Sequence, residues 1–340
     1  MSIKTFFKDE ADVTIKTVIE NKKKGKFSFV LVTDSHLSDN AENTCENIKY
    51  VDETADFDCM VHMGDFLCGN IPEKVSRRLL REEIEKFRSS TKSNILYAVQ
   101  GNHDGYRDET YKGQTVPDMA LDENWYEDTK YMDENENLKR PGIKPYYYVD
   151  IPEHKLRFIV VATNSYIIDK EKKEFKKCYG ITTEELEWIA GEALKFSESG
   201  WTVMAFSHRS PVSGLDGGNQ DEQGGRELKE ILFAFKNKGV CSFGGKTYDF
   251  GKYDNEFACW CFGDTHGDSQ HAFDGITYIS TASETAYIPQ LWTVNYGGFP
   301  SPRDLGTKNE DVWDAVTVSL KEKTVYFTRF GAGEDRIVKY

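Results

Sequence analysis

Short apolar runs alternate with amphipathic segments through the first hundred residues. The apolar runs lie at 27–33, 59–63 and 95–100, and their β-branched and aromatic side chains predict strands buried in a sheet. Residues 41–54 and 72–88 lie between them and have the apolar spacing of helices. This alternation predicts an α/β fold whose sheet contains parallel strands.

The second half of the chain continues with strands and helices. A Thr-Thr-Glu-Glu capping pattern at 182–185 predicts the start of a helix, and residues 228–235 have helical spacing as well. The later strands are expected at 146–149, 156–162, 202–206, 257–262, 276–280, 316–320 and 324–330. We expect the C-terminal strands to complete a second sheet. No repeat or linker interrupts the pattern, so residues 1–340 are predicted to form one domain.

The regular pattern is lost between residues 105 and 144, where acidic residues surround Tyr106, Tyr111, Trp125, Tyr126 and Tyr131. A long segment of this kind inside a compact domain usually has a function. We interpret it as an insertion that forms a lid or a wall for the substrate. A surface decoration without a function is the alternative.

Five of the predicted strands end in side chains that bind metal ions or transfer protons. Carboxylate and imidazole groups are common metal ligands, and Asn102 adds a neutral carbonyl oxygen. The imidazole of His103 titrates near neutrality, and Asp104 could orient it. The residues are Asp34, His36, Asp65, Asn102, His103, Asp104, His208, Asp264 and His266. Each motif alone could be a polar turn, but five in succession favour a metal-assisted hydrolase.

Composition narrows the possible partners. The chain has 340 residues, 39% of them hydrophobic, with a net charge of −14 and a pI near 5.1. The acidic charge disfavours long nucleic acids and anionic membrane surfaces, and an anionic substrate would need positive charge supplied locally, for example by metal ions. The chain has no signal-peptide pattern and no apolar run of about 18 residues. It has seven cysteines, an odd number that cannot all pair in disulfides within the chain. We therefore expect a cytoplasmic protein with reduced thiols.

Together the motifs resemble those of the calcineurin-like metallophosphoesterases. They are Asp-x-His at 34–36, Gly-Asp at 64–65, Gly-Asn-His-Asp at 101–104, the histidine at 208 and Gly-x-x-His at 263–266. The resemblance implies two facing mixed β-sheets flanked by helices, in four α/β/β/α layers. In the family, the final motif usually has a histidine where this chain has Asp264.

The resemblance also implies a binuclear site and a division of roles. One metal ion would be held by Asp34, His36 and His266. The second would be held by Asn102 and His208, with Asp65 bridging the two ions. We add Asp264 as a candidate ligand of the second ion. His103, oriented by Asp104, would be the catalytic histidine that does not bind metal.

The resulting hypothesis is a phosphatase or phosphodiesterase that acts on a phosphorylated small molecule or nucleotide. Two divalent ions (Mn, Fe, Mg or Zn, with Mn or Fe favoured) would activate a bridging hydroxide for in-line attack. His103 would protonate the leaving oxygen or stabilise charge, and Arg209 would contact the phosphate. The alternative is a phosphoesterase-like scaffold that has an incomplete second metal site and binds a partner.

Overall fold

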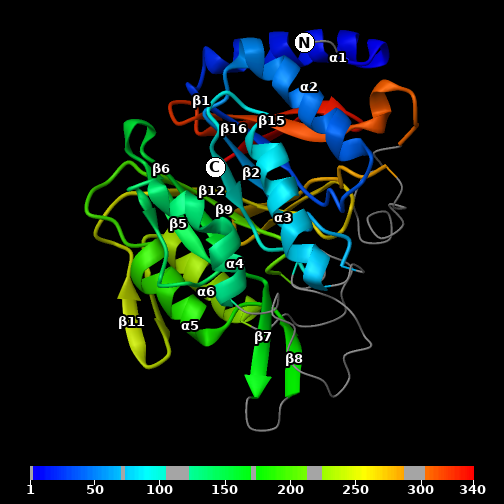
Figure 1. Ribbon diagram of the computed structural model, residues 1–340. Coiled ribbons are helices and arrows are strands. Elements are labelled where there is room, and N and C mark those ends of the chain that lie inside the picture. The colour runs from blue at the N-terminus through cyan, green and yellow to red at the C-terminus, as the bar shows by residue number, and fades with distance from the viewer. Residues whose placement is uncertain (1–2, 70–72, 105–121, 170–173, 213–223, 287–302) are drawn as a thin grey trace.

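The computed structural model describes residues 3–69, 73–104, 122–169, 174–212, 224–286 and 303–340. Two mixed β-sheets form its centre (Figure 1). The first sheet has the strand order β17-β16-β15-β1-β2-β3. Its strands are β1 (Phe27–Val32), β2 (Cys59–His62), β3 (Leu96–Ala98), β15 (Val312–Ser319), β16 (Thr324–Gly331) and β17 (Arg336–Lys339). The strands β1, β2 and β3 are parallel, as the alternating pattern predicted.

The second sheet has the strand order β13-β14-β12-β9-β6-β5-β4. Its strands are β4 (Leu138–Lys139), β5 (Tyr147–Ile151), β6 (Leu156–Val161), β9 (Thr202–Ser207), β12 (Glu256–Phe262), β13 (Ser269–Phe273) and β14 (Ile276–Ser280). The four central strands β14, β12, β9 and β6 are parallel. Two separate hairpins are formed by β7 (Asn164–Asp169) with β8 (Glu174–Tyr179), and by β10 (Val240–Phe243) with β11 (Lys246–Asp249).

Helices cover the outer faces of both sheets. On the first sheet, α1 (Lys8–Lys22) contacts β15 and β16, α2 (Asn40–Ala55) packs on α1, and α3 (Glu73–Arg88) contacts β3. On the second sheet, α5 (Thr183–Trp188), a π-helical turn (Ile189–Ala193) and α6 (Gly225–Lys236) share one apolar core with the strands. No helix among the described residues has the length and apolar character needed to cross a bilayer.

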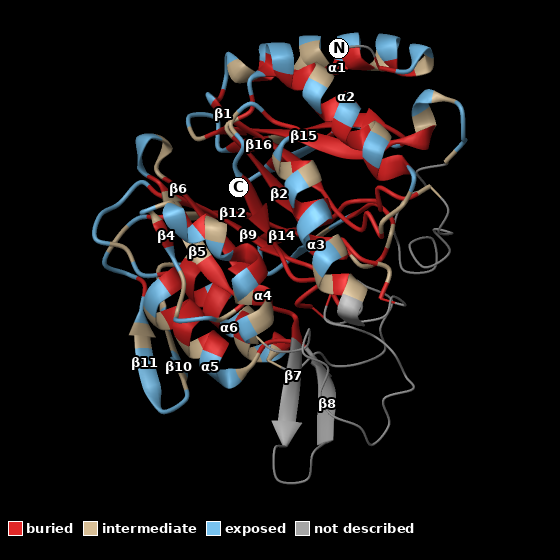
Figure 2. Cartoon of the chain, in the orientation of Figure 1, coloured by how far each residue is buried: buried red, intermediate tan, exposed pale blue. Residues whose placement is uncertain are grey.

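The two sheets face each other across an aromatic core. The ring of Phe29 in β1 lies 5.0 Å from the ring of Phe158 in β6 and 5.9 Å from that of Phe206 in β9, measured between centroids. The Tyr147 hydroxyl of β5 donates to the carbonyl of Ala98 in β3, at 3.0 Å. Buried residues fill this space and the layers beneath the helices (Figure 2). The predicted α/β fold with two facing mixed sheets and flanking helices is therefore confirmed.

The predicted place of the C-terminal strands is wrong. β15 pairs antiparallel with β1, from Phe27 opposite Val318 to Leu31 opposite Asp314, so β15, β16 and β17 extend the first sheet. All eight residues of β15 are buried. A strand buried on both faces has no side-chain alternation that could indicate which sheet it joins.

The described half of the predicted insertion has regular structure. It contains α4 (Asp122–Thr129), a 3₁₀ turn (Lys130–Glu134) and β4, which pairs with β5. The buried carboxylate of Asp128 accepts hydrogen bonds from Arg77 and Arg81 of α3, at 2.9 and 2.6 Å. Residues 105–121, which follow Asp104 directly, lie outside the described residues. A substrate wall there stays a prediction.

Candidate metal centre

The structure brings the predicted metal ligands together from both sheets. Asp34 and His36 follow β1, Asp65 follows β2, and Asn102 follows β3. From the second sheet, His208 follows β9, while Asp264 and His266 follow β12. The carboxylates and imidazoles form three groups of three residues. Within each group, the ligand atoms lie within 4.8 Å of one another. The groups are Asp34 with His36 and His266, His36 with Asp65 and His103, and Asp34 with Asp65 and His208.

The turns that carry these ligands have an unusual backbone. Asp34, His36, Asp65, Asp264 and His266 have φ between 51° and 63°, a left-handed conformation that L-residues seldom adopt. Such strain persists where the surrounding structure enforces it, and it clusters at functional sites.

Two glycines allow the turns to approach one another closely. A Cβ atom on Gly101 would lie 2.1 Å from Oδ1 of Asp65, and one on Gly263 would lie 2.5 Å from Oδ2 of Asp34. Both distances are shorter than any real contact, so only glycine fits at these positions.

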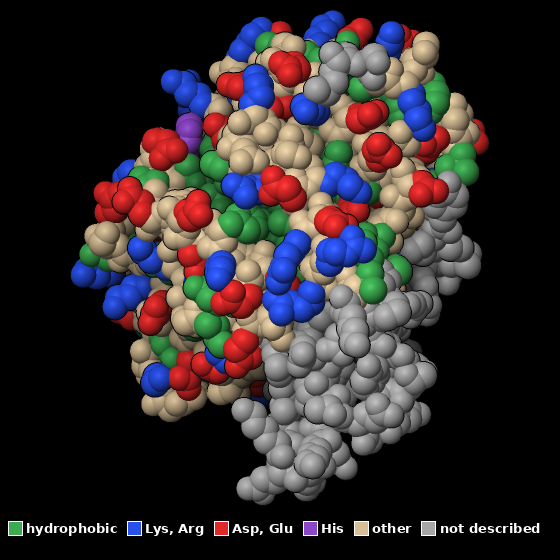
Figure 3. All heavy atoms as spheres, viewed as in Figure 1, with side chains coloured by type: hydrophobic (Ala, Val, Ile, Leu, Met, Phe, Trp, Pro, Cys, Tyr) green, Lys and Arg blue, Asp and Glu red, His purple; other side chains and the backbone are tan. Residues whose placement is uncertain are grey.

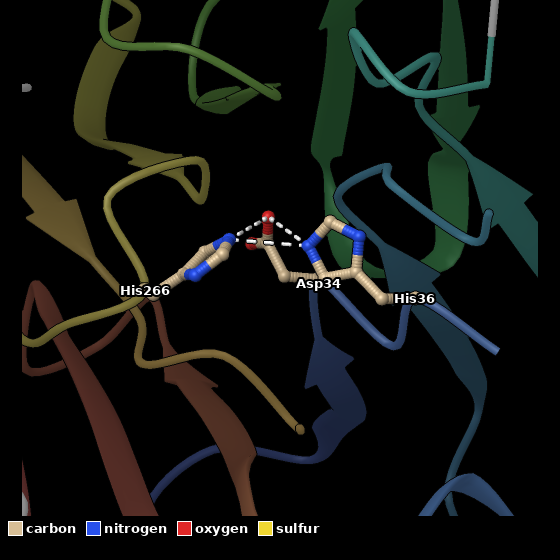
Figure 4. Close-up of side chains that lie close together, drawn as sticks. All are labelled: Asp34, His36 and His266. Carbon is tan, nitrogen blue, oxygen red and sulfur yellow. Dashed lines mark hydrogen bonds and ion pairs between the residues drawn. The ribbon is translucent and has the colours of Figure 1, made fainter. Parts of the chain in front are cut away.

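The first cluster consists of Asp34, His36 and His266 (Figure 4). The Nε2 atoms of the two histidines are 3.1 Å apart, and Oδ1 of Asp34 lies 3.3 Å from Nε2 of His266 and 3.6 Å from that of His36. Nδ1 of His36 donates to the carbonyl of Leu67 at 3.1 Å, which leaves the Nε2 lone pair directed at the cluster. Oδ1 of Asp34 is buried and accepts no hydrogen bond from a described residue. This donor set fits a divalent cation.

The electrostatics also favour a cation in the first cluster. Burial opposes the charge of Asp34, but His208 and His266 outweigh it and hold the pKa of this carboxyl well below its usual value. Burial likewise opposes protonation of His36, but Asp34 and Asp65 raise its pKa to about 9. The site thus favours ionised carboxylates and attracts positive charge.

The second cluster is built around His208. Its Nε2 atom lies 2.8 Å from Oδ1 of Asn102, 3.2 Å from Oδ2 of Asp65 and 3.4 Å from Oδ1 of Asp264. Its Nδ1 atom donates to the carbonyl of Met63 at 2.8 Å. The Nε2 lone pair therefore faces three oxygen atoms, an arrangement that requires a proton or a metal ion between them.

Asp65 connects the two clusters. Its Oδ2 atom lies 3.8 Å from Nε2 of His36, 3.8 Å from Nε2 of His103 and 3.2 Å from Nε2 of His208. Its Oδ1 atom accepts a hydrogen bond from the backbone N–H of His103 at 2.7 Å. One carboxylate oxygen thus faces ligand nitrogens of both clusters, as a bridging residue would.

The predicted pairing of His103 with Asp104 is wrong. Nδ1 of His103 donates to the carbonyl of Cys68 at 2.8 Å. Asp104 instead accepts hydrogen bonds from the backbone N–H groups of Asp65, Leu67 and Gly101, at 2.9, 3.1 and 2.8 Å. Asp104 therefore holds together the two turns that carry Asp65 and Asn102. Neighbours in sequence after a strand end point in different directions, which the sequence alone does not reveal.

Asp264 joins the second cluster to Arg209. Its Oδ2 atom lies 3.4 Å from Nη1 of Arg209, while its Oδ1 atom faces His208. Burial opposes its charge, but His208 and Arg209 outweigh this effect and lower the pKa of Asp264. Asp264 and Arg209, both predicted as site residues, thus form an ion pair beside the second cluster.

Several supporting groups were not predicted from the sequence. The hydroxyl of Thr33 donates to Oδ2 of Asp34 at 2.6 Å, and that of Ser283 donates to the backbone carbonyl of Asp34 at 2.9 Å. Thr33 could have been predicted as a supporting group, because it directly precedes the predicted ligand Asp34. Ser283 could not, because it follows β14 and is distant in sequence from the motifs. The carbonyls that orient the histidines could not be predicted either, because every residue has a backbone carbonyl.

The comparisons with known proteins agree with the motifs. The model of the calcineurin-like phosphoesterase family matches residues 27–268, so the chain belongs to this family. No curated protein matches the chain.

Several solved structures are similar to this one at low sequence identity. A putative 5′-nucleotidase from Staphylococcus aureus has 11% identity and a TM-score of 0.43, with 92% of this chain and 54% of that chain covered. A predicted phosphoesterase from Streptococcus pneumoniae has 11% identity and a TM-score of 0.33, with 92% and 96% covered. A single mutant of Vps29 from Entamoeba histolytica has 9% identity and a TM-score of 0.38, with 92% and 97% covered.

Proposed function

We propose that this protein is a metal-dependent phosphoesterase. The observation that carries the proposal is the convergence of two imidazole Nε2 atoms, 3.1 Å apart, on the buried Oδ1 atom of Asp34. Two nitrogen lone pairs and a carboxylate oxygen this close repel one another unless a proton or a metal cation lies between them, and the family's chemistry favours the metal cation.

Two divalent ions would be held by the two clusters, with Asp65 shared. The first would use Asp34, His36 and His266, and the second Asn102, His208 and Asp264. When bound, such ions supply Lewis acidity and the positive charge that a phosphoryl group requires. The anionic, hard carboxylate of Asp264 favours Mn or Fe over Zn in the second position.

His103 is the candidate proton donor. Its Nδ1 atom is held by the carbonyl of Cys68, so the opposite nitrogen, Nε2, faces the centre with its orientation fixed. Oδ2 of Asp65 lies 3.8 Å from this Nε2 atom. In its protonated form, the ring can donate its Nε2 proton to the oxygen of the departing group.

Arg209 is the candidate contact for the phosphoryl oxygens. Its side chain is 15% exposed and its guanidinium is held by Asp264, so the group is oriented before a substrate arrives. A planar cation of this kind can donate two parallel hydrogen bonds to a phosphate.

A phosphorylated small molecule or nucleotide is the proposed substrate class. Basic and acidic side chains are interspersed over the visible face of the molecule (Figure 3), which supports a small substrate rather than a long polyanion. We also propose a cytoplasmic location, which the odd number of cysteines supports because it favours reduced thiols.

A screen of phosphomonoesters and phosphodiesters with Mn²⁺ tests the proposal. We expect metal-dependent turnover of at least one ester, and its loss in the His36→Ala variant. His154→Ala serves as the matched control, because the His154 ring packs on Phe27 at the opposite end of β1. Metal binding without turnover of any ester would favour the scaffold instead.

A further inference from the structure

A cavity of about 350 Å³ lies at the other end of the second sheet from the metal centre. Asn255, in its wall, directly precedes β12, whereas Asp264 follows the far end of the same strand. The walls come from the π-helical turn, α6 and the segment that begins with β11, which gather in the lower left of Figure 1. Its size falls within the range of small-molecule sites, roughly 300–1,000 Å³.

Aromatic rings line the inner part of this cavity. Phe235 of α6 has its ring centroid 5.5 Å from that of Phe250 and 6.2 Å from that of Phe196. Phe235 and Phe250 are buried. Rings arranged in this way offer flat faces and edges against which a planar ring can pack.

Two exposed lysines, Lys195 and Lys252, also line the cavity. Neither forms an ion pair within the described part of the chain. By contrast, Lys246 on the adjacent hairpin is paired with Glu187 at 2.6 Å. Asp249 is the acidic residue of the wall, and its Oδ1 atom accepts a hydrogen bond from the backbone N–H of Gly251 at 2.8 Å. The Nζ atom of Lys252 lies 4.9 Å from the centroid of the Tyr253 ring, a contact that leaves its charge uncompensated by a carboxylate. In a protein with a net charge of −14, two lysines without a carboxylate partner among the described residues favour an anion.

Two further polar groups in the wall have unused hydrogen-bonding capacity. The hydroxyl of Tyr248 is buried and has no partner among the described residues. The carbonyl oxygen of the Asn255 side chain accepts from the backbone N–H of Trp201 at 2.9 Å, while its amide NH₂ donates to no described residue. A buried hydroxyl without a partner is costly, and a ligand that accepts its hydrogen bond would remove this cost.

We propose that this cavity binds a small aromatic anion, in which a planar ring carries one carboxylate or similar group. The ring would pack on Phe196, Phe235 and Phe250, and the anionic group would lie between Lys195 and Lys252. The buried hydroxyl of Tyr248 would turn toward this group when it binds. This site is separate from the metal centre and does not depend on the proposed phosphoesterase activity.

Calorimetric titration of the full-length protein with 2-naphthoate tests this proposal, because this probe has the ring and the charge but no ester to hydrolyse. We expect saturable binding with a Kd below about 1 mM. The neutral analogue 2-naphthamide should bind at least about fivefold more weakly, because it lacks the charge that the lysines attract. The same titration of His36→Ala should give the same affinity, which separates this cavity from the metal centre.

Substitutions in the wall locate the binding. The double variant Lys195→Ala/Lys252→Ala should weaken binding about fivefold or more, and Tyr248→Phe, which removes only the hydroxyl, about threefold. Lys246→Ala is the matched control and should remain within about twofold of the parent. The proposal is overturned if 2-naphthoate does not saturate, if 2-naphthamide binds equally well, or if both the double variant and Tyr248→Phe bind like the parent.

Discussion

The two clusters of the candidate metal centre differ in how the protein compensates their charge. In the first cluster, Oδ1 of Asp34 faces two imidazole nitrogens and accepts no hydrogen bond from a described residue. In the second, the carboxylate of Asp264 already pairs with Arg209. A carboxylate that has its own cation has less to gain from a metal ion. The first cluster is therefore expected to bind metal more tightly than the second.

Removal of a ligand from the first cluster should have the largest effect. In His36→Ala we expect the tighter metal ion to be lost and turnover to fall about 1,000-fold or more, since the metal contributes several kcal/mol to catalysis. Metal content and turnover of a responsive ester measure both effects. His154→Ala should change neither. Full metal content in His36→Ala would remove this residue from the site.

Substitution of His103 should separate proton transfer from metal binding. His103→Ala is expected to lower turnover about 100- to 1,000-fold with both metal ions retained, because its assigned role is proton donation. Metal analysis of the variant, together with its rate, checks this. Loss of a full metal equivalent would instead make His103 a ligand.

Asp104→Asn is the companion variant to His103→Ala, since Asp104 holds the backbone of two turns and not the His103 ring. We expect a destabilisation of about 1–3 kcal/mol, with the pH profile of the remaining activity unchanged. Denaturant unfolding and a pH–rate profile test the two parts. A shifted profile with unchanged stability would restore the pairing of His103 with Asp104.

Substitution of Asp264 addresses the second cluster directly. Asp264→Ala should weaken the second metal ion about 10- to 100-fold, because it removes a carboxylate that faces His208 and releases Arg209. Asp264→His should restore binding and increase tolerance of zinc. Metal titrations of the three proteins decide the point. Two full equivalents with unchanged metal preference in Asp264→Ala would make this residue a brace of the turn.

A buried carboxyl behind the first cluster gives the smallest expected effect, and it depends on pH. Burial and the charge of Asp311 raise the pKa of Glu284 to about 8, against hydrogen bonds from Thr44 and Ser38. The folded protein then binds a proton that the unfolded chain releases near pH 4.5, so stability falls as the pH rises from 4.5 through 8.

Glu284→Gln removes this titration while keeping the size of the side chain. At pH 9 the variant should be more stable than the parent by on the order of 1–2 kcal/mol, with a smaller difference at pH 5. Thermal unfolding at the two pH values measures it. An equal difference at both would show that Glu284 does not carry the effect.

The sequence could predict those parts of the site that depend on side chains at strand ends, but not those that depend on backbone groups. Asp34, Asp65 and His208 were predictable because each follows a buried apolar run, and parallel strands bring their carboxyl ends together. The partners of His103 and Asp104 were not, since backbone carbonyls and N–H groups carry no sequence signature. The place of β15 was missed for a related reason, because uniform burial removes the alternation that identifies a sheet face.

Titration of the metal-stripped protein with Mn²⁺, followed by calorimetry and by hydrolysis of a responsive ester, tests the central claim most directly. We expect two equivalents with distinct affinities, and turnover that requires both. The tighter equivalent should be absent in His36→Ala, and the weaker one should be reduced in Asp264→Ala. Absence of stoichiometric Mn²⁺ binding, or two bound ions without turnover of any phosphate ester, would contradict the account.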